Sequence, residues 1–183
     1  MVLKNMKFQL NIGNRIIILQ ALFRKKRNSE YVEGYTNRCK DGKYVIFLDY
    51  DRIPIEWIME ELKHLQEIYE IGDFYIFQSS KESYHAVCLD KVVLSEYLSI
   101  LNNSSVDTDY VNVPLHFGRK IWSLRLTDKN NKSIRFVGKA KGKFSELNQS
   151  LAHAIILNNL FDLKIELKYP DGEKELILAR YPI

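Results

Sequence analysis

The sequence predicts an α+β fold, because strand-like and helix-like patterns alternate along the middle of the chain. Residues 44–48 form a nearly continuous apolar run, which is typical of a central buried strand. Apolar residues then recur at helical spacing over residues 54–70, which indicates an amphipathic helix. Further short apolar runs and a second helical pattern follow. We expect all of them to belong to a single domain, residues 1–183.

The N-terminal part, residues 1–42, is expected to be a β unit. Residues 6–23 have the pattern of two strands that are separated by the turn signal Gly13-Asn14. Residues 30–42 are polar, so we expect them to connect this unit to the core.

Residues 43–132 are expected to form the core. The strand at 44–48 leads into Asp49-Tyr50-Asp51, and Pro54 suits the first turn of the following helix. The later core elements are strands at 74–77 and 84–89, a helix at 93–101 and a strand at 120–126. This β-α-β-β-α-β order is that of the ferredoxin-like or RRM-like unit. In such a sheet, we expect helices on one face and a ligand-accessible surface on the other.

Residues 133–183 are expected to add a helix and a hairpin to the core. The helix is predicted over residues 144–161 from its apolar spacing. The hairpin strands are predicted at 163–169 and 173–179, with the turn at Asp171-Gly172. The predicted fold is therefore an RRM-like core with an N-terminal β unit and a C-terminal helix plus β-hairpin.

Composition permits a packed core and sets few other limits. The chain is 46% hydrophobic and 27% charged, and its net charge of +4 allows a nucleic-acid partner without requiring one. Cys39 and Cys88 are too few for a disulfide framework. No apolar stretch is long enough to span a bilayer, and the first residues lack a signal-peptide pattern. We therefore expect a cytoplasmic protein that does not associate with membranes.

Asp49 and Asp51 are the first candidate site residues. They stand two apart at the end of the predicted strand, so both should project from the same face. Carboxylates this close repel one another, and a divalent cation would neutralise them. Their hard oxygen ligands suit Mg²⁺ or Mn²⁺. The alternative is a solvated strand end at which Asp51 helps to start the helix.

Ser83 and His85 repeat the two-residue spacing on a neighbouring predicted strand. Their hydroxyl and imidazole groups can donate hydrogen bonds to phosphate oxygens. A third acid would complete a two-metal site, and either Asp107 or Asp109 could supply it. Cations that could neutralise phosphates follow in the sequence at Arg119, Lys120 and Arg125.

Two basic clusters are candidate nucleic-acid contacts, with solvated surface as the alternative reading. The first cluster consists of Arg24, Lys25, Lys26 and Arg27, and the second of Lys139, Lys141 and Lys143. Tyr110 or Trp122 could stack on a base.

The order of these motifs resembles the archaeo-eukaryotic primase superfamily. That family has a DxD or DxE motif, an SxH motif and a hydrophobic residue followed by Asp. They correspond here to Asp49-Tyr50-Asp51, Ser83-Tyr84-His85 and Val106-Asp107. Residues 119–126 are similar to the basic strand that follows the third motif in the primase–polymerase branch. The resemblance covers roughly residues 44–132.

The resemblance implies a DNA primase or polymerase that adds nucleotides to a 3′-hydroxyl on a single-stranded DNA template. Asp49, Asp51 and Asp107 would be catalytic and would bind Mg²⁺ or Mn²⁺. Ser83 and His85, with Lys120 or Arg125, would bind the nucleoside triphosphate. The small form, without a helicase domain, suits a virus, plasmid or similar element whose helicase is a separate protein.

Two other classes of function are compatible with an RRM-like sheet. A replication-initiator nuclease would need a His-x-His metal pair, which the sequence lacks, and a Tyr nucleophile on the later helix. A non-catalytic RRM-like module would bind single-stranded nucleic acid or act in replication initiation, with stacking aromatics on its central strands. The two acids and the SxH motif favour the enzyme.

Overall fold

The computed structural model describes residues 4–12, 15–23, 34–125, 133–143, 147–168 and 174–176. The chain divides into two compact units, Met1–Tyr31 and Val32–Ile183. In the first unit, β1 (Lys4–Ile12) pairs antiparallel with β2 (Arg15–Phe23), in register from Lys4 opposite Phe23 to Ile12 opposite Arg15. The two expected N-terminal strands are therefore confirmed.

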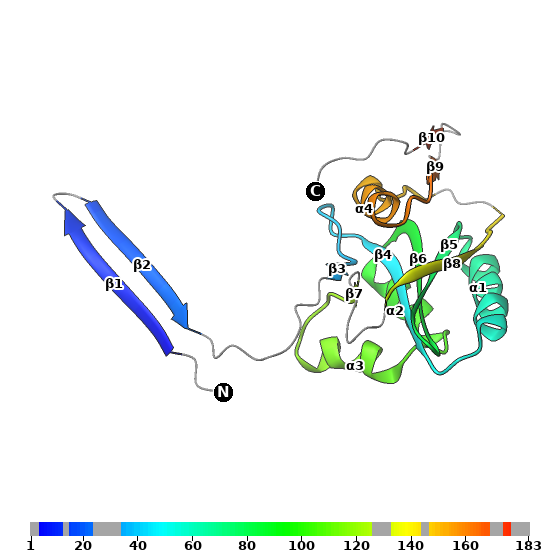
Figure 1. Ribbon diagram of the computed structural model, residues 1–183, viewed down its shortest axis with the longest axis horizontal. Helices are drawn as coiled ribbons and strands as arrows, with labels where there is room; N and C mark the ends of the chain where they lie inside the picture. The colour runs from blue at the N-terminus through cyan, green and yellow to red at the C-terminus, as the bar shows by residue number, and fades with distance from the viewer. Residues whose placement is uncertain are drawn as a thin grey trace. The chain divides into compact units, whose positions relative to one another are not determined.

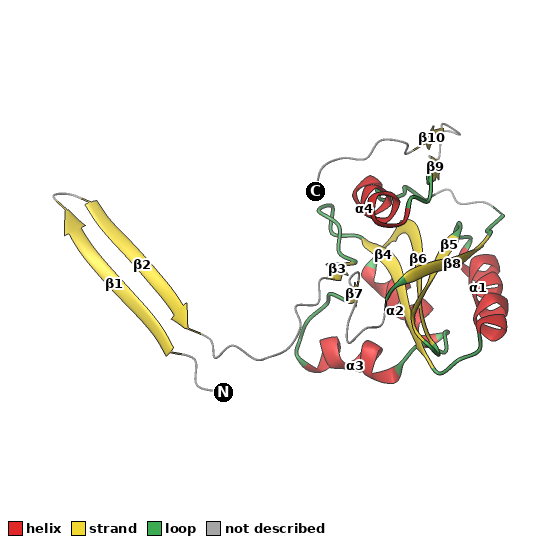
Figure 2. Cartoon of the chain, viewed as in Figure 1, coloured by secondary structure: helices red, strands yellow, loops and turns green. Residues whose placement is uncertain are grey.

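The second unit mixes helices with antiparallel sheets, which confirms the α+β class (Figures 1 and 2). Its strands are β3 (Gly34–Thr36), β4 (Tyr44–Asp51), β5 (Phe74–Ser80), β6 (Ser83–Val92), β7 (Ser123–Arg125), β8 (Arg135–Ala140), β9 (Glu166–Lys168) and β10 (Lys174–Leu176). Its helices are α1 (Ile55–Tyr69), α2 (Leu94–Asn102), α3 (Thr108–His116) and α4 (Leu151–Phe161).

The central sheet has the strand order β4-β6-β5-β8. Helix α1 connects β4 to β5, and β6 lies between these two strands and pairs antiparallel with both. Strand β8 pairs with β5, while the short β7 pairs with β3 and not within this sheet. Strand β7 begins at Ser123 and not at the predicted residue 120, and residue 126 lies outside the described part of the chain. The fourth strand of the central sheet is β8 and not β7.

Helix α1 illustrates how the sequence produces these elements. Pro54 precedes the helix, and Ile58, Leu62 and Leu65 recur at the spacing that places them on one buried face. Glu70 at the C-cap adopts a left-handed backbone, which ends the helix. The predicted range 54–70 is confirmed to within one residue at each end.

Apolar clusters cover both faces of the central sheet. One face carries Ile46 and Leu48, which belong to the cluster that includes the buried residues of α1 and α2. The other carries Val45 and Phe47, which belong to a cluster with Ala154 of α4. Figure 1 shows α4 and α1 on opposite sides of the sheet. The expectation of an open face is therefore wrong, because residues after the predicted core supply a helix that covers it.

Hydrogen bonds of buried polar groups hold the segment after β8 against the end of the sheet. The fully buried carboxylate of Asp90 accepts hydrogen bonds from the Gly72 amide at 2.6 Å and from Gln149 Nε2 at 2.8 Å. Gly142 lies so close that a Cβ there would come within 2.7 Å of the Gly72 backbone. This packing places α4, which starts at Leu151 and not at the predicted residue 144, on the sheet. Residues 144–146 lie outside the described part of the chain.

Candidate active site

Two neighbouring strands bring four of the predicted site residues together. Asp49 and Asp51 lie at the C-terminal end of β4, and the antiparallel register sets Asp49 opposite His85 and Asp51 opposite Ser83 on β6. Side chains alternate along a strand, so these four residues share the face of Phe47. We call them the β4–β6 patch. His85 is buried beside the α4-covered cluster, whereas Asp51 is exposed.

Ser83 is hydrogen-bonded within the patch and does not project freely. Its Oγ donates to Asp51 Oδ1 at 2.6 Å and accepts from Ser80 Oγ at 2.8 Å. A hydroxyl has a single proton to donate. In this structure, Ser83 therefore orients the carboxylate of Asp51, and it could donate to a phosphate only by releasing that bond.

The third acid reaches the patch through the backbone. The amide of Asp107 donates to the carbonyl of Asp49 at 2.8 Å. Asp107 also caps α3, because its Oδ1 accepts from the amides of Asp109 at 2.7 Å and Tyr110 at 3.0 Å. Residues 108–116 are thus helical and not extended, so Asp109 does not project beside Asp107 as on a strand. Of the two candidates, Asp107 is the acid whose charge acts on Asp49.

Electrostatics single out Asp49 and His85. Burial, followed by the negative charges of Asp107 and Asp51, raises the pKa of Asp49 from 3.8 to about 6. Burial and the nearby Arg125 lower the pKa of His85 from 6.5 to about 4. His85 Nε2 lies 3.5 Å from Asp49 Oδ1. At neutral pH the patch therefore holds a neutral imidazole beside an ionised, poorly solvated carboxylate.

Two cations in the described part of the chain act on this patch: Arg52 Nε lies 3.7 Å from Asp51 Oδ2, and Arg125 acts on Asp49 and His85. Arg125 lies on β7, its Nη2 donates to the carbonyl of Ser79, and its charge lowers the pKa of both Asp49 and His85. Lys120, the other predicted phosphate-binding cation, is exposed in the segment between α3 and β7.

Sequence reasoning missed a carboxylate that positions the third acid. Tyr50 faces α1, where its hydroxyl donates to Glu61 Oε1 at 2.8 Å. The Ser105 amide lies 3.0 Å from both oxygens of Glu61. Glu61 thus joins β4 to the residue two before Asp107. Side-chain alternation along β4 predicts that Tyr50 faces the helices, and this was the one signal for its contact with Glu61. Nothing in the sequence indicates that Ser105 also contacts Glu61.

The patch fits a hard divalent cation by charge and donor type. Among the described residues, no three His, Cys, Asp or Glu side chains are arranged to hold a metal ion. However, Asp107 and Asp51 both oppose ionisation of Asp49, and Arg125 offsets this only in part, since the pKa remains raised. A cation among these carboxylates would relieve the repulsion, and carboxylate oxygens are ligands that Mg²⁺ and Mn²⁺ prefer.

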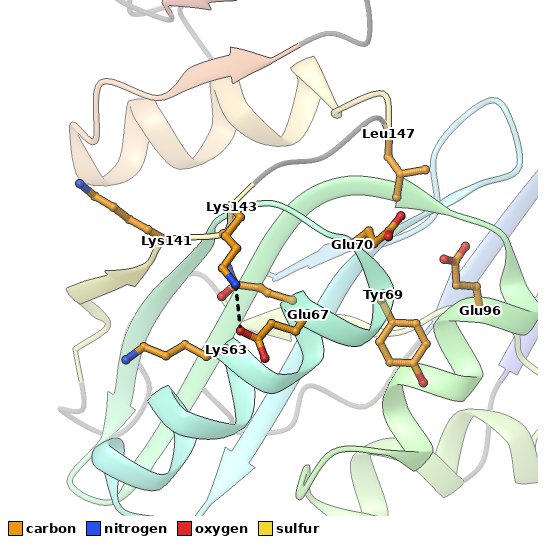
Figure 3. Close-up of a pocket in the computed structure, with 10 residues that line it drawn as sticks. Lys63, Glu67, Tyr69, Glu70, Glu96, Lys141, Lys143 and Leu147 are labelled. Atoms are coloured by element: carbon orange, nitrogen blue, oxygen red, sulfur yellow. Dashed lines mark hydrogen bonds and ion pairs between the residues drawn. The ribbon is translucent and has the colours of Figure 1, made fainter.

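The predicted basic clusters have separate outcomes. Arg24, Lys25, Lys26 and Arg27 lie outside the described residues. Lys139 pairs with Asp73 at 2.6 Å, and Lys143 pairs with Glu67 at 3.2 Å. Figure 3 shows Lys143 and Lys141 beside Lys63 at a pocket between α1 and the segment after β8, which Glu70 and Glu96 also line. The cations of this cluster are therefore partly neutralised by neighbouring acids.

Trp122, one of the two predicted stacking residues, is fully buried. Its ring contacts Tyr97 edge-on, with centroids 5.1 Å apart. This ring therefore belongs to the core and cannot stack on a base.

The opposite pKa shifts of Asp49 and His85 lead to a testable pH dependence. Between about pH 4 and 6, the folded chain holds a proton on Asp49 and the unfolded chain holds one on His85. The two contributions to the slope of stability against pH therefore cancel. In His85→Gln only the Asp49 contribution remains. The free energy of unfolding should therefore fall as pH rises from 4 to 6, by up to about 1.4 kcal/mol per pH unit.

Asp49→Asn should show the opposite slope, since only the His85 contribution remains. Denaturant unfolding of wild type and both variants at pH 4, 5 and 6 measures these slopes. Parallel curves for all three proteins would show that the two groups titrate normally in the folded state.

No described helix is both long enough and apolar enough to span a membrane. Comparisons of the chain with models of protein families, with curated proteins and with solved structures find no match.

Proposed function

We propose that the chain is a metal-dependent nucleotidyltransferase of the primase–polymerase type, which extends a 3′-hydroxyl on a single-stranded DNA template. The observation that carries this proposal is the β4–β6 patch, where Asp49 and Asp51 pair with His85 and Ser83 across two neighbouring strands. The adjacent Asp107 adds a third acid whose charge reaches Asp49. These are the residue types and the chain order of the primase motifs.

The proposal includes an RRM-like arrangement of the core. Strands β4, β6 and β5, with α1 crossing between β4 and β5, form a split β-α-β unit. This unit sets the end of β4 beside the start of β6, and so brings the two motifs together. The fourth strand of the RRM order would be β7, which here pairs with β3.

Each residue of the patch has a role in the proposed reaction. Asp49, Asp51 and Asp107 would hold Mg²⁺ or Mn²⁺, which when bound would lower the pKa of the 3′-hydroxyl and stabilise the departing pyrophosphate. Neutral His85 would donate a hydrogen bond to a triphosphate oxygen, with Arg125 supplying positive charge. Ser83 orients Asp51.

A non-catalytic RRM-like module is the less favoured function. Such modules stack bases on aromatic side chains of the two central strands. The aromatic residues on this face are Phe47 of the outer strand β4 and Tyr75 and Phe77 of the central strand β5, and all three are buried in the cluster that includes α4. A base could reach them only if α4 moved.

The test is incorporation of labelled nucleoside triphosphates on primed and unprimed single-stranded templates, with Mg²⁺ or Mn²⁺. Wild type should incorporate nucleotide in a manner that chelator abolishes. Asp51→Asn and Asp107→Asn should each lower the rate at least about 100-fold. Asn also caps helices well, so Asp107→Asn removes the charge and keeps the start of α3.

Asp109→Asn is the matched control, since this exposed acid lies two residues from Asp107. It should retain the wild-type rate to within about twofold. Absence of metal-dependent incorporation by wild type under all conditions would refute the enzyme proposal. Loss of activity in Asp109→Asn with activity retained in Asp107→Asn would reassign the third acid.

A further inference from the structure

Helix α3 carries exposed apolar side chains. None of its residues is fully buried, although Tyr110 and Val111 pack against the core. Val113 is 49% exposed, Leu115 is 41% exposed and Phe117, which follows the helix, is 68% exposed. Surface helices usually turn apolar residues toward the core and polar ones toward water. The C-terminal half of α3 therefore presents apolar area that the fold itself does not use.

The turn after α3 holds Phe117 in a defined position. The Gly118 amide donates to Leu115 at 2.9 Å, and the Arg119 amide donates to Pro114 at 2.8 Å. Gly118 has a φ of +64°, so these bonds form the glycine-dependent motif that ends many helices. The Phe117 ring meets His116 edge-on, with centroids 5.2 Å apart. The ring is thus held by an ordered turn while it remains exposed.

Positive charge accompanies this apolar surface. Arg119 and Lys120 come just after Phe117 and Gly118, and both are exposed. From Tyr110 to Thr127 the sequence contains no Asp or Glu. An exposed aromatic ring followed by exposed cations is the composition of surfaces that stack bases and contact phosphates of single strands. A protein partner that binds through apolar contacts alone would not explain the two cations.

We propose that Val113, Leu115, Phe117, Arg119 and Lys120 form a platform that binds single-stranded nucleic acid. Phe117 stacks on a base, and Arg119 and Lys120 contact phosphates of the same strand. We call these residues the α3 platform. The inference rests on the proposed function, since it names where the template or primer strand lies. Asp107 caps the start of α3, so the nine-residue helix separates it from the platform by roughly 13 Å.

The test measures the affinity for fluorescein-labelled oligo-dT and oligo-U by fluorescence anisotropy, in buffer that contains EDTA and no nucleotides. Phe117→Ala should weaken binding about 5- to 150-fold, the range expected when one aromatic–base stack is removed. Trp57→Ala is the matched control, because Trp57 is 71% exposed on another helix, α1. Its affinity should stay within about twofold of wild type.

Salt dependence tests the cations separately. Arg119→Gln/Lys120→Gln should weaken binding and reduce the slope of log affinity against log salt by about 0.7 for each phosphate that the variant no longer neutralises. Lys40→Gln, which removes an exposed cation before β4, should leave the slope unchanged. An unchanged slope in the double variant would overturn the assignment of Arg119 and Lys120.

Binding and catalysis can fail independently in these experiments. If Phe117→Ala binds either oligonucleotide as wild type does, or wild type binds neither, the α3 platform is wrong, whatever the result of nucleotide incorporation. If Phe117→Ala loses binding while wild type incorporates no nucleotide, the platform stands and the enzyme proposal falls. If Phe117→Ala instead changes only the oligomeric state, the surface docks protein, and the nucleic-acid proposal is overturned.

Discussion

Asp49→Asn is expected to abolish nucleotide incorporation and at the same time to stabilise the fold at neutral pH. The proposed metal site needs the charge of this carboxylate, so the rate should fall by about 1000-fold or more. The folded structure bears an electrostatic cost for the same charge, because burial and two neighbouring acids raise the pKa of Asp49 to about 6. Asn keeps the shape of the side chain and removes that cost.

The sign of the stability change follows from the raised pKa. Asp49 ionises near pH 4 in the unfolded chain and near pH 6 in the folded chain, so its charge destabilises the fold increasingly between these values and fully above pH 6. This difference between the two pKa values corresponds to about 3 kcal/mol. The side chain is 33% exposed, so we expect about 1–2 kcal/mol after solvent screening. At pH 8 the variant should melt about 2–8 °C higher.

Thermal unfolding with and without Mg²⁺ or Mn²⁺ checks this prediction without relying on activity. Metal should raise the Tm of wild type by mass action and leave that of Asp49→Asn nearly unchanged. Asp41→Asn is the control of opposite sign, because the hydrogen bond from Lys91 lowers the pKa of Asp41, so removing that charge should reduce stability slightly. A variant with normal activity, or one that metal stabilises as strongly as wild type, would contradict the assignment of Asp49.

The sequence predicted the central elements of the fold well, because the apolar patterns of these segments match the faces that the folded chain buries. The run that forms β4 and the periodicity that forms α1 both reflect one buried surface. The two-residue rule also predicted that Asp49 and Asp51 would share a face, as would Ser83 and His85. The antiparallel register then brings the pairs opposite each other.

The elements that the sequence did not reveal have weak local patterns. Helix α3 contains Pro114 and no fully buried residue, so the sequence has no apolar periodicity that would indicate a helix there. Its one clear helix signal is the N-cap residue Asp107, and an Asp is equally compatible with the end of an extended segment. Strand β8 exposes Phe136 and Val137 in succession, which conceals strand alternation. Covering of the second sheet face depends on α4, about 100 residues after β4, and no local pattern reports such a contact.

Glu61→Gln is expected to lower nucleotide incorporation about 10- to 100-fold although Glu61 touches no proposed substrate, as is typical when a residue that orients a metal ligand is changed. The carboxylate accepts from Tyr50 and from the Ser105 amide, and Ser105 leads through the buried Val106 to Asp107. The Asp107 amide in turn bonds to the Asp49 carbonyl. Gln keeps one oxygen, but its amide nitrogen takes the place of Oε2 and faces the Ser105 amide, so the second of the two Ser105 contacts is replaced by a pair of opposed donors.

The experiment separates positioning of Asp107 from general stability. If Glu61 acts through Asp107, Glu61→Gln should raise the half-saturating concentration of Mg²⁺ or Mn²⁺ more than the KM for nucleotide. Glu60→Gln is the matched control, since this exposed neighbour on α1 should change neither constant. A Glu61→Gln variant that melts earlier but keeps the wild-type metal dependence would show that the carboxylate only stabilises the fold. Measured together, the two constants thus test whether the contact between α1 and the segment before α3 is part of the site.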